Sequence, residues 1–420
     1  MASLAAIPAA TVESLAVDPF DVSRPELWRD YQWREPFARM RAEAPIHYTP
    51  ESKFGAYWSL TTYKPIQYVE ALPKLFSSHW EVGGITVAGD PTRLEDGEVR
   101  TPMFIAMDPP HHTAQRRTVA PAFTPSMIEI MRIETAKRTG EVLDSLPIGQ
   151  PFDWVDRVSI ELTTGMLAKL FDYPWEERAN LTRWSDMLGD VEMFDTFEKR
   201  QQRLASAYEM GASFNQLWER KKGQPPANDL ISIMLHSDAM SHMSEFEFIG
   251  NLILLIVGGN DTTRNSMTAL AYGLDKFPGE RAKLESNPAL IVNTASEIIR
   301  WQTPLAHMRR TATEDTEIDG HKIRKHDKIA MWYVSANRDE SVFPNGDDIR
   351  VDRENARRHL SFGYGIHRCV GARVAELQLQ ILMEEMARRR LRVNVIGEPE
   401  RVAACFVNGY KKMTVELSTY

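Results

Sequence analysis

The chain has 420 residues, 43% of them hydrophobic and 26% charged, and its formal net charge is −8 at pH 7. This acidic balance excludes a general nucleic-acid-binding protein, and no apolar run approaches the roughly 20 residues that cross a bilayer. The sequence also lacks a four-cysteine set for an iron–sulfur cluster and the glycine-rich motifs of dinucleotide and triphosphate sites, so any electrons that it uses come from another protein.

Residues 1–40 are expected to form an irregular N-terminal segment that packs on the rest, because Pro19, Pro25 and Pro36 interrupt them. The start of the chain has no basic residues and so does not resemble a signal peptide. Residues 41–420 contain no Ser/Gly-rich or Pro-rich linker and are expected to form a single domain. Two cysteines allow at most one disulfide bond, which is typical of a cytoplasmic protein.

Strands and a loop are predicted next. Residues 46–48 and 54–60 are predicted to form an early pair of strands. Residues 77–101 are rich in Gly, Thr and Asp and have little periodicity, so they are predicted to be a long loop. Long loops in compact enzymes often line or cover a site.

The segment Asp108-Pro109-Pro110-His111-His112 opens a helical pattern that continues through Arg116. Standing alone, a histidine and an arginine on such a turn are ordinary surface residues. Helical patterns then dominate residues 127–240. Within them, residues 187–197 are rich in Leu, Val, Met and Phe, which fits either the core or the wall of a pocket.

A long buried helix is predicted from Ser244, in a capping-box pattern with Glu247, to just before Pro278. It spans about 32 residues and is apolar nearly all round in residues 252–257. The segment Gly258-Gly259-Asn260-Asp261-Thr262-Thr263 then places two glycines, an acid and two alcohols in its interior. The glycines cost on the order of 1 kcal/mol each, and burial of the acid adds a desolvation cost. The pattern indicates either a kinked packing contact or a functional site.

Another helix is predicted from Asn287-Pro288, with proline at the first helical position, to Pro304. Its Glu297 and Arg300 lie three residues apart and therefore share a face. Residues 305–310 lead into strands. Asp319-Gly320 is predicted to be a turn between two of them.

The segment Phe362-Gly363-Tyr364-Gly365-Ile366-His367-Arg368-Cys369-Val370-Gly371 reads as a loop that ends where a helix begins. Cys369 is therefore expected at a helix N-terminus, where free N–H groups and the helix dipole favour a thiolate. Gly363, Gly365 and Gly371 supply positive φ or leave room for a flat group. A lone cysteine is usually a small buried hydrophobic residue, but a thiolate beside a planar group describes an axial haem ligand.

Two further features flank this loop. Arginines crowd around Cys369, and they form either a solvated basic face or a docking face for an acidic electron carrier: Arg357, Arg358, Arg368 and Arg373. Residues 402–406 and 413–417 are predicted to pair as a terminal hairpin. Cys405, within it, is expected to be buried and inert.

The loop matches Phe-Gly-x-Gly-x-His-x-Cys-x-Gly at every fixed position, so the chain resembles the cytochrome P450 family. Residues 258–263 resemble the oxygen-activation motif of that family. Residues 108–116 resemble its Asp-Pro-Pro-x-His-x-x-x-Arg pattern, and Glu297 with Arg300 resembles its Glu-x-x-Arg pair. The resemblance implies a mainly α fold with small β-sheets, and haem b between the long helix and the cysteine loop.

The resemblance also implies roles for individual residues. Cys369 would ligate the iron, Thr262 would hydrogen-bond dioxygen, and Asp261 would relay protons. The expected haem-binding set is His112, Arg116, Gly258, Arg310, Phe362, Gly363, His367, Cys369 and Gly371. The expected substrate-lining set is Leu254, Val257, Gly258, Ala306, Met308 and Phe406. A structural ion-pair set would comprise Glu297, Arg300 and Arg338, with Arg338 joining the pair from a later loop.

The implied activity is insertion of one atom of O2 into an unactivated C–H bond by a monomeric enzyme. The electrons would come from a separate 2Fe–2S ferredoxin and its NAD(P)H-dependent reductase. Residues 255–267, 359–369 and 406–410 resemble soluble bacterial alkane hydroxylases, which implies terminal hydroxylation of medium-chain alkanes or fatty acids. The alternatives are a P450 hydroxylase of a terpene or another bulky hydrophobic compound, and a peroxide-using or non-turnover haem-thiolate protein.

Overall fold

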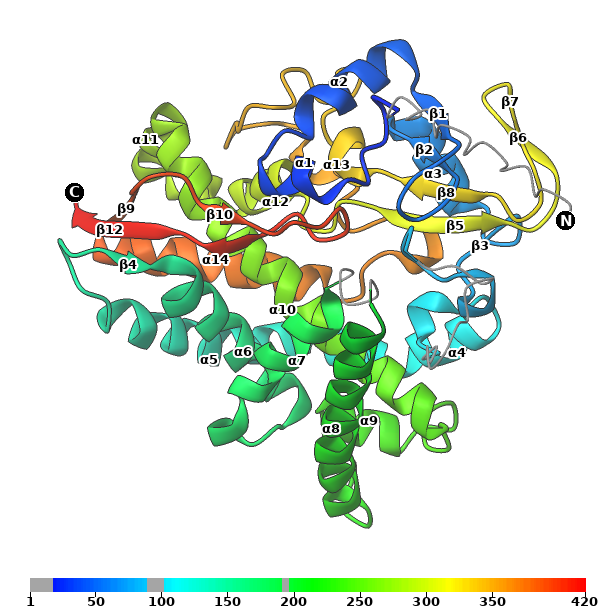
Figure 1. Ribbon diagram of the computed structural model, residues 1–420. Helices are drawn as coiled ribbons and strands as arrows, with labels where there is room; N and C mark the ends of the chain where they lie inside the picture. Colours follow the sequence, from blue (N-terminus) through cyan, green and yellow to red (C-terminus); the bar gives the residue numbers. More distant parts are fainter. Residues whose placement is uncertain (1–17, 89–101, 191–195) are drawn as a thin grey trace, which may run out of the picture.

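The computed structural model describes residues 18–88, 102–190 and 196–420, and in these ranges the chain is mainly helical with small β-sheets (Figure 1). The α-helices are α1 Pro25–Arg29, α2 Arg34–Glu43, α3 Tyr63–Ala71, α4 His111–Val119, α5 Pro125–Asp144, α6 Glu161–Phe171, α7 Ala179–Gly189, α8 Phe197–Lys221, α9 Leu230–Leu235, α10 Glu245–Lys276, α11 Pro278–Ser286, α12 Ile291–Gln302, α13 Tyr333–Ala336 and α14 Ala372–Arg389. The strands are β1 Ile46–Thr49, β2 Tyr57–Leu60, β3 Phe76–Ser77, β4 Phe152–Asp153, β5 Met308–Ala312, β6 Thr316–Ile318, β7 His321–Ile323, β8 Lys328–Met331, β9 Leu391–Val395, β10 Glu400–Arg401, β11 Tyr410–Lys412 and β12 Thr414–Thr419.

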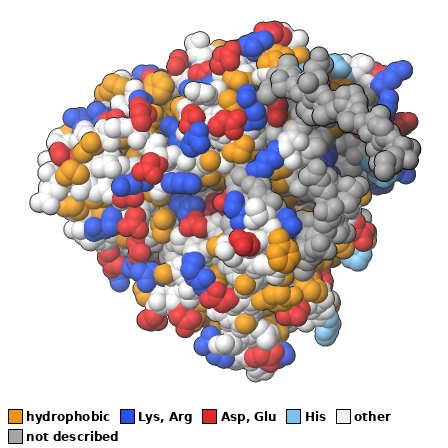
Figure 2. All heavy atoms as spheres, in the orientation of Figure 1, with side chains coloured by type: hydrophobic (Ala, Val, Ile, Leu, Met, Phe, Trp, Pro, Cys, Tyr) orange, Lys and Arg blue, Asp and Glu red, His pale blue; other side chains and the backbone are white. Residues whose placement is uncertain are grey.

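Three predicted segments lie partly outside the described residues. These are the N-terminal segment (residues 1–17), the long loop (89–101) and the apolar stretch of residues 187–197 (191–195). On the face that Figure 2 shows, acidic and basic side chains are interspersed. No helix among the described residues is long and apolar enough to cross a membrane.

The N-terminal segment is more regular than predicted, because α1 and α2 both fall within residues 18–43. Pro25 is the first residue of α1 and Pro36 is the third of α2. Residues in the first turn of a helix donate no intrahelical N–H bond, so a proline there costs no hydrogen bond. Pro25 and Pro36 are therefore compatible with the starts of α1 and α2. Trp28 and Phe37 of this segment pack against Trp332 in a buried aromatic cluster.

The largest sheet has the strand order β1-β2-β8-β5-β3, in which only β2 and β8 run parallel. The antiparallel β1–β2 pair is the predicted early pair of strands. β6 and β7 form a separate hairpin whose turn is Asp319-Gly320. Both turn residues have positive φ, 44° and 81°, as a two-residue hairpin turn of this kind requires.

The predicted terminal hairpin has the wrong pairing. β10 pairs with β11 only over its two residues, and residues 402–409 form a loop that is closed by a 3.0 Å bond from the Val402 N–H to the Gly409 carbonyl. β12 pairs antiparallel with β9, the strand that directly follows α14. The alternation of apolar and polar residues in a strand does not determine which earlier strand pairs with β12.

Helix α10 runs through the middle of the helical layer and contacts α6, α7, α8, α12 and α14 (Figure 1). Its 32 residues match the predicted helix. Ser244 Oγ accepts a 3.3 Å hydrogen bond from the Glu247 N–H, as expected of the N-cap. The carboxylate of Glu247 does not complete the capping box but accepts a hydrogen bond from Gln115 of α4. Hydrophobic clusters on both sides of α10 fix its position in the core.

The ion-pair set at Glu297 includes a different arginine from the one predicted. Glu297 is fully buried and accepts two 2.8 Å hydrogen bonds from Arg300. The second cation is Arg353, whose Nε lies 3.0 and 3.1 Å from the two carboxylate oxygens. Arg338 donates instead to Asp347 and to the carbonyls of Val334 and Trp301. Both arginines lie in loops after β8, and only the path of those loops decides which one reaches Glu297.

Candidate functional site

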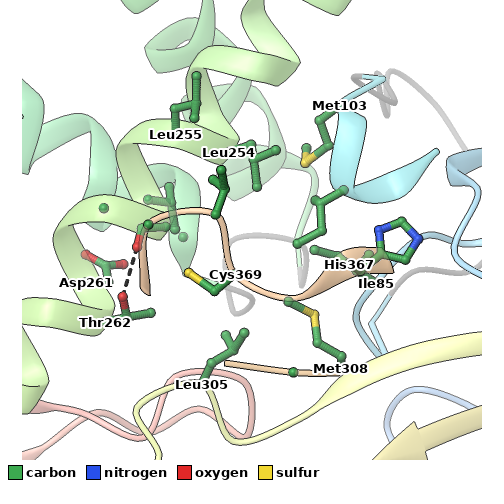
Figure 3. A pocket seen from close by; sticks show the side chains of 18 of the residues that line it. Ile85, Met103, Leu254, Leu255, Asp261, Thr262, Leu305, Met308, His367 and Cys369 are labelled. Atoms are coloured by element: carbon green, nitrogen blue, oxygen red, sulfur yellow. Dashed lines mark hydrogen bonds between the residues drawn. The ribbon is translucent and has the colours of Figure 1, made fainter. Parts of the chain in front are cut away.

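A cavity of about 380 Å³ lies between α10 and the loop of residues 362–371 (Figure 3). Cys369 extends into this space from the loop, and Thr262 and Asp261 lie beside it on α10. Leu305 and Met308, just before and at the start of β5, line the side that faces the C-terminal loop. Residues far apart in the sequence therefore meet around a single thiol.

The cysteine loop is fixed by its glycines and by one backbone hydrogen bond. Gly363 and Gly365 have φ of 67° and 66°, which other residues rarely adopt. A Cβ on Gly365 would lie 2.5 Å from the backbone oxygen of Glu70, so glycine is required there. The Cys369 N–H donates a 2.7 Å bond to the Phe362 carbonyl. These constraints hold Cys369 at the edge of the cavity.

The ionisation of Cys369 differs from the sequence-based expectation. Helix α14 begins at Ala372, three residues after Cys369. The thiol is open to the cavity but remote from bulk water, and this burial raises its pKa. The Gly371 N–H and the guanidinium groups of Arg116 and Arg368 lower the pKa of the thiol but do not outweigh burial. Burial thus opposes the thiolate that the nearby helix end was expected to favour.

The two adjacent glycines of α10 have different surroundings. A Cβ added to Gly259 would come within 2.7 Å of Leu167 on α6, so this glycine allows close helix packing. A Cβ added to Gly258 meets no atom within 4 Å, because Gly258 faces the cavity. Thr262, one turn later, also faces the cavity, and its hydroxyl donates a 2.8 Å bond to the Gly258 carbonyl. Gly258 and Thr262, which are unfavourable in a helix interior, thus lie on the face of α10 that borders the cavity.

Asp261 belongs to a polar chain that leads outward from the cavity. Its Oδ1 accepts hydrogen bonds from Ser185 at 2.8 Å and from Arg264 at 3.1 Å. Arg264 also pairs at 2.7 Å with Asp186, whose side chain is 54% exposed. Burial raises the pKa of Asp261, while Arg264 opposes this shift. The chain of groups connects the cavity side of α10 with the surface of α7.

Unpartnered histidine nitrogens occur at His367, which lines the cavity, and at His112, which packs against His367. His112 on α4 is 2% exposed, yet neither ring nitrogen has a hydrogen-bond partner. His367 Nδ1 is also unpartnered, while its Nε2 lies 2.9 Å from Ser78 Oγ. The two rings lie 4.2 Å apart, and burial lowers the pKa of His112 to about 4. Buried polar atoms without partners need an explanation, and a group bound in the cavity would supply one for these rings.

The chemistry of this wall fits haem. Arg116 and Arg310 also line the cavity, and guanidinium groups bind carboxylates such as the haem propionates. The thiol of Cys369 suits iron, and the open face at Gly258 leaves room for a flat ring. The structure thus brings into one cavity wall the predicted residues Arg116, Gly258, Arg310, Phe362, Gly363, His367, Cys369 and Gly371. The predicted His112 does not line the cavity itself but packs against the ring of His367.

Sequence reasoning missed Glu70 and Tyr333, which also line the cavity. Glu70 lies on α3, where Tyr63 and Ile66 form the buried face. It occupies the next position of that apolar stripe, seven residues after Tyr63 and four after Ile66. A charged residue in an apolar stripe was a signal that the sequence did contain.

The predicted substrate residues line the cavity with one exception. Leu254, Val257, Gly258, Met308 and Phe406 border it. Ala306 does not, because it is fully buried in the aromatic cluster with Trp332. Its N–H donates to the Phe406 carbonyl at 2.9 Å, and its carbonyl accepts from Val334. This extended segment alternates its side chains, so Leu305 faces the cavity in place of Ala306.

Comparison with protein-family models gives a match over residues 95–395 to the family described as Cytochrome P450. Among curated proteins, linalool 8-monooxygenase from Pseudomonas putida is 33% identical over 404 residues, which cover 94% of this chain and 98% of that protein. The methyl-branched lipid omega-hydroxylase from Mycobacterium tuberculosis is 30% identical over 397 residues, which cover 91% of this chain and 90% of that protein.

Solved structures show the same relationship over nearly the whole chain. Cytochrome P450-153 from Novosphingobium aromaticivorans is 56% identical with a TM-score of 0.91, covering 95% of this chain and all of that one. CYP153D17 from Sphingomonas sp. PAMC 26605 is 64% identical with a TM-score of 0.92, covering 96% of this chain and all of that one. The mainly helical fold inferred from sequence is confirmed.

Proposed function

Since the chain belongs to the cytochrome P450 family, and is thus a haem monooxygenase, we propose that it hydroxylates the terminal carbon of medium-chain alkanes or fatty acids. The observation that carries the proposal is the apolar wall beside the thiol, formed by Leu254, Val257, Leu305, Met308 and Phe406. These side chains offer no hydrogen bond, so they select a substrate by shape and apolar contact. The relative named for omega-hydroxylation of a methyl-branched lipid supports the terminal position.

A second candidate substrate is a terpene alcohol, because linalool 8-monooxygenase is similar over 94% of the chain. Such a substrate is shorter and more branched than an alkane of equal carbon number. Its hydroxyl group would need a polar partner, and the apolar wall supplies none among the five side chains named above. The wall therefore favours a hydrocarbon end beside the thiol, from an alkane or from a fatty acid whose carboxylate lies away from this wall.

Haem, when bound, supplies the redox chemistry by which one atom of O2 enters a C–H bond and the other leaves as water. In our assignment Cys369 ligates the iron, and His112, Arg116 and Arg310 bind the propionates. Thr262 orients a proton at its Oγ1, which is within reach of both the cavity and the Gly258 carbonyl. Asp261 passes protons inward, since Arg264 and Asp186 connect it to the surface.

The proposed electron donor is a separate ferredoxin. Five arginines around the cysteine loop and α4 have exposed side chains: Arg117, Arg357, Arg358, Arg368 and Arg373. Among them lies Glu376, whose pKa is raised by burial although the positive charges of Arg357, Arg368 and Arg373 act in the opposite direction. A positive face beside the iron ligand on an acidic chain suits an acidic carrier.

A spin-state titration of the ferric protein tests the substrate class. Alkanes, fatty acids and terpene alcohols of graded carbon number are added, and the Soret band is followed. A saturable shift toward the high-spin form that peaks at medium chain length is the expected result. A flat response to every chain together with a shift caused by a terpene or steroid would overturn the proposed substrate. Comparing an alkane with the fatty acid of equal length separates the two expected classes.

Thr262→Ala tests the proposed proton path. We expect this variant to retain haem and the substrate-induced spin shift, but to release hydrogen peroxide. Product formed per NADH should fall by at least about tenfold, because a positioned proton donor typically contributes more than that. Thr268→Ala is the matched control, since Thr268 lies on the same helix and bonds Ser159 and the Arg264 carbonyl outside the cavity. Full coupling in Thr262→Ala would remove Thr262 from the mechanism.

A further inference from the structure

Glu70 is a buried carboxyl group at the edge of the haem cavity. Its side chain is 1% exposed, and the residue lines the cavity together with Arg310 and Tyr333. Tyr333 Oη donates a 2.6 Å hydrogen bond to Oε1 of Glu70. Arg310 Nη2 lies 3.5 Å from the same oxygen. The other oxygen, Oε2, is buried and has no hydrogen-bond partner.

This arrangement leaves one carboxyl oxygen with a missing partner. Arg310 is the residue assigned above to a haem propionate, so Glu70 and that propionate share one guanidinium. Two carboxylates on one cation repel each other when both are ionised. A carboxylic acid beside a carboxylate instead forms a strong, charge-assisted hydrogen bond. The neutral form of Glu70 therefore suits the site better than the ionised form.

The surroundings of Glu70 already favour its neutral form. Burial raises its pKa to about 7, although Arg310, Tyr333 and the Tyr364 N–H act in the opposite direction. Tyr333 cannot compete for the proton near neutral pH, because burial and Glu70 raise its own pKa well above the usual value. A propionate added beside Arg310 would raise the pKa of Glu70 further.

We propose that Glu70 is a further haem-contacting residue. In its neutral form it donates a hydrogen bond from Oε2 to the propionate at Arg310, and at a pH where it is ionised in the ferric protein it takes up a proton when the haem is reduced. This proposal rests on the haem site proposed above. An external reductant would supply one electron to the bound haem, and where Glu70 is ionised its carboxylate would take one proton from water. Reduction adds negative charge, so it strengthens the attraction for that proton. By linkage, the reduction potential falls as pH rises through the range in which Glu70 ionises.

Other titratable groups near Arg310 need to be distinguished from Glu70. Burial lowers the pKa of His112 on α4 and of His367 in the short 3-10 helix Gly365–His367, and the charge of Arg310 adds to this lowering. Propionates would raise the pKa of either ring, so a histidine is the main competing source of a pH-dependent potential. Tyr333, on α13, acts on Glu70 by its hydrogen bond and lowers the carboxyl pKa.

The test is the reduction potential of the holoprotein, measured by spectroelectrochemistry between about pH 5 and pH 9. In the wild type we expect a fall of up to 59 mV for each tenfold drop in proton activity, the value for one proton per electron. Glu70→Gln keeps the shape of the side chain and should remove the slope. Tyr333→Phe should move the sloping region to higher pH, because the hydrogen bond that lowers the Glu70 pKa is lost.

A second measurement identifies the group directly. Infrared difference spectra between the ferric and ferrous forms should contain the band of a protonated carboxyl group, and Glu70→Gln should lack it. An unchanged slope in Glu70→Gln, or its loss in His112→Gln alone, overturns the proposal.

The outcomes also separate this proposal from the haem assignment. If the wild-type reduced CO complex has no thiolate-type spectrum, the haem site itself is wrong and the role of Glu70 is excluded with it. If that spectrum is normal in wild type and Glu70→Gln but the slope persists, only the role of Glu70 is excluded.

Discussion

Replacement of Cys369 by alanine is expected to abolish the thiolate-type spectrum of the reduced CO complex and all hydroxylation. Cys369 is the only thiol among the cavity-lining residues of the described chain. Water or an imidazole in its place would not donate electron density to the iron in the same way. The measurement is the Soret band of the reduced CO complex, with haem content determined in parallel.

The second cysteine provides a matched control. Cys405 is 2% exposed and packs in the cluster that contains Trp332. Cys405→Ala should keep the thiolate-type spectrum, because Cys405 does not line the cavity. A thiolate-type spectrum that survived Cys369→Ala would refute the ligand assignment.

Replacement of Glu297 by alanine is expected to give the largest loss of stability among the substitutions considered. Glu297, Arg300 and Arg353 are all at most 4% exposed, so the change would leave two buried guanidinium groups without their carboxylate. Removing one partner of a buried ion pair costs roughly 3–5 kcal/mol. Chemical denaturation of the holoprotein measures the change in the free energy of unfolding.

A double-mutant cycle tests which arginine belongs to this set. Glu297 and Arg353 should show a coupling energy of at least about 1 kcal/mol, as is usual for directly bonded residues. Glu297 and Arg338 should show little coupling, because the hydrogen bonds of Arg338 go to Asp347 and two backbone carbonyls. The reverse pattern would restore Arg338 as the partner and contradict the structure.

The sequence alone was sufficient where the cause of a structure is local. The N-cap at Ser244 and the apolar run after it determine α10, since each interaction joins residues within one or two turns. Asp319-Gly320 determines its hairpin turn because the two residues adopt positive φ at low cost. Gly363 and Gly365 likewise show positive φ in the cysteine loop, as predicted.

The site was predictable in part for the same reason. Cys369, Thr262 and Asp261 lie in short motifs whose spacing is visible in the sequence, and the fold brings them to one cavity. The pKa of Cys369 was not predictable, because a nearby helix end favours a thiolate while burial opposes it. The degree of burial is a property of the whole fold.

Only the tertiary structure decided which distant residues meet. Arg353 and not Arg338 reaches Glu297, Leu305 and not Ala306 faces the cavity, and β12 pairs with β9. In each case the local sequence allowed both choices, and the difference in free energy came from packing and hydrogen bonds across the chain. The sequence by itself determined α10, the Asp319-Gly320 turn and the chemical groups at the site. Tertiary packing determined their partners, because burial and long-range contacts act only once the elements are assembled.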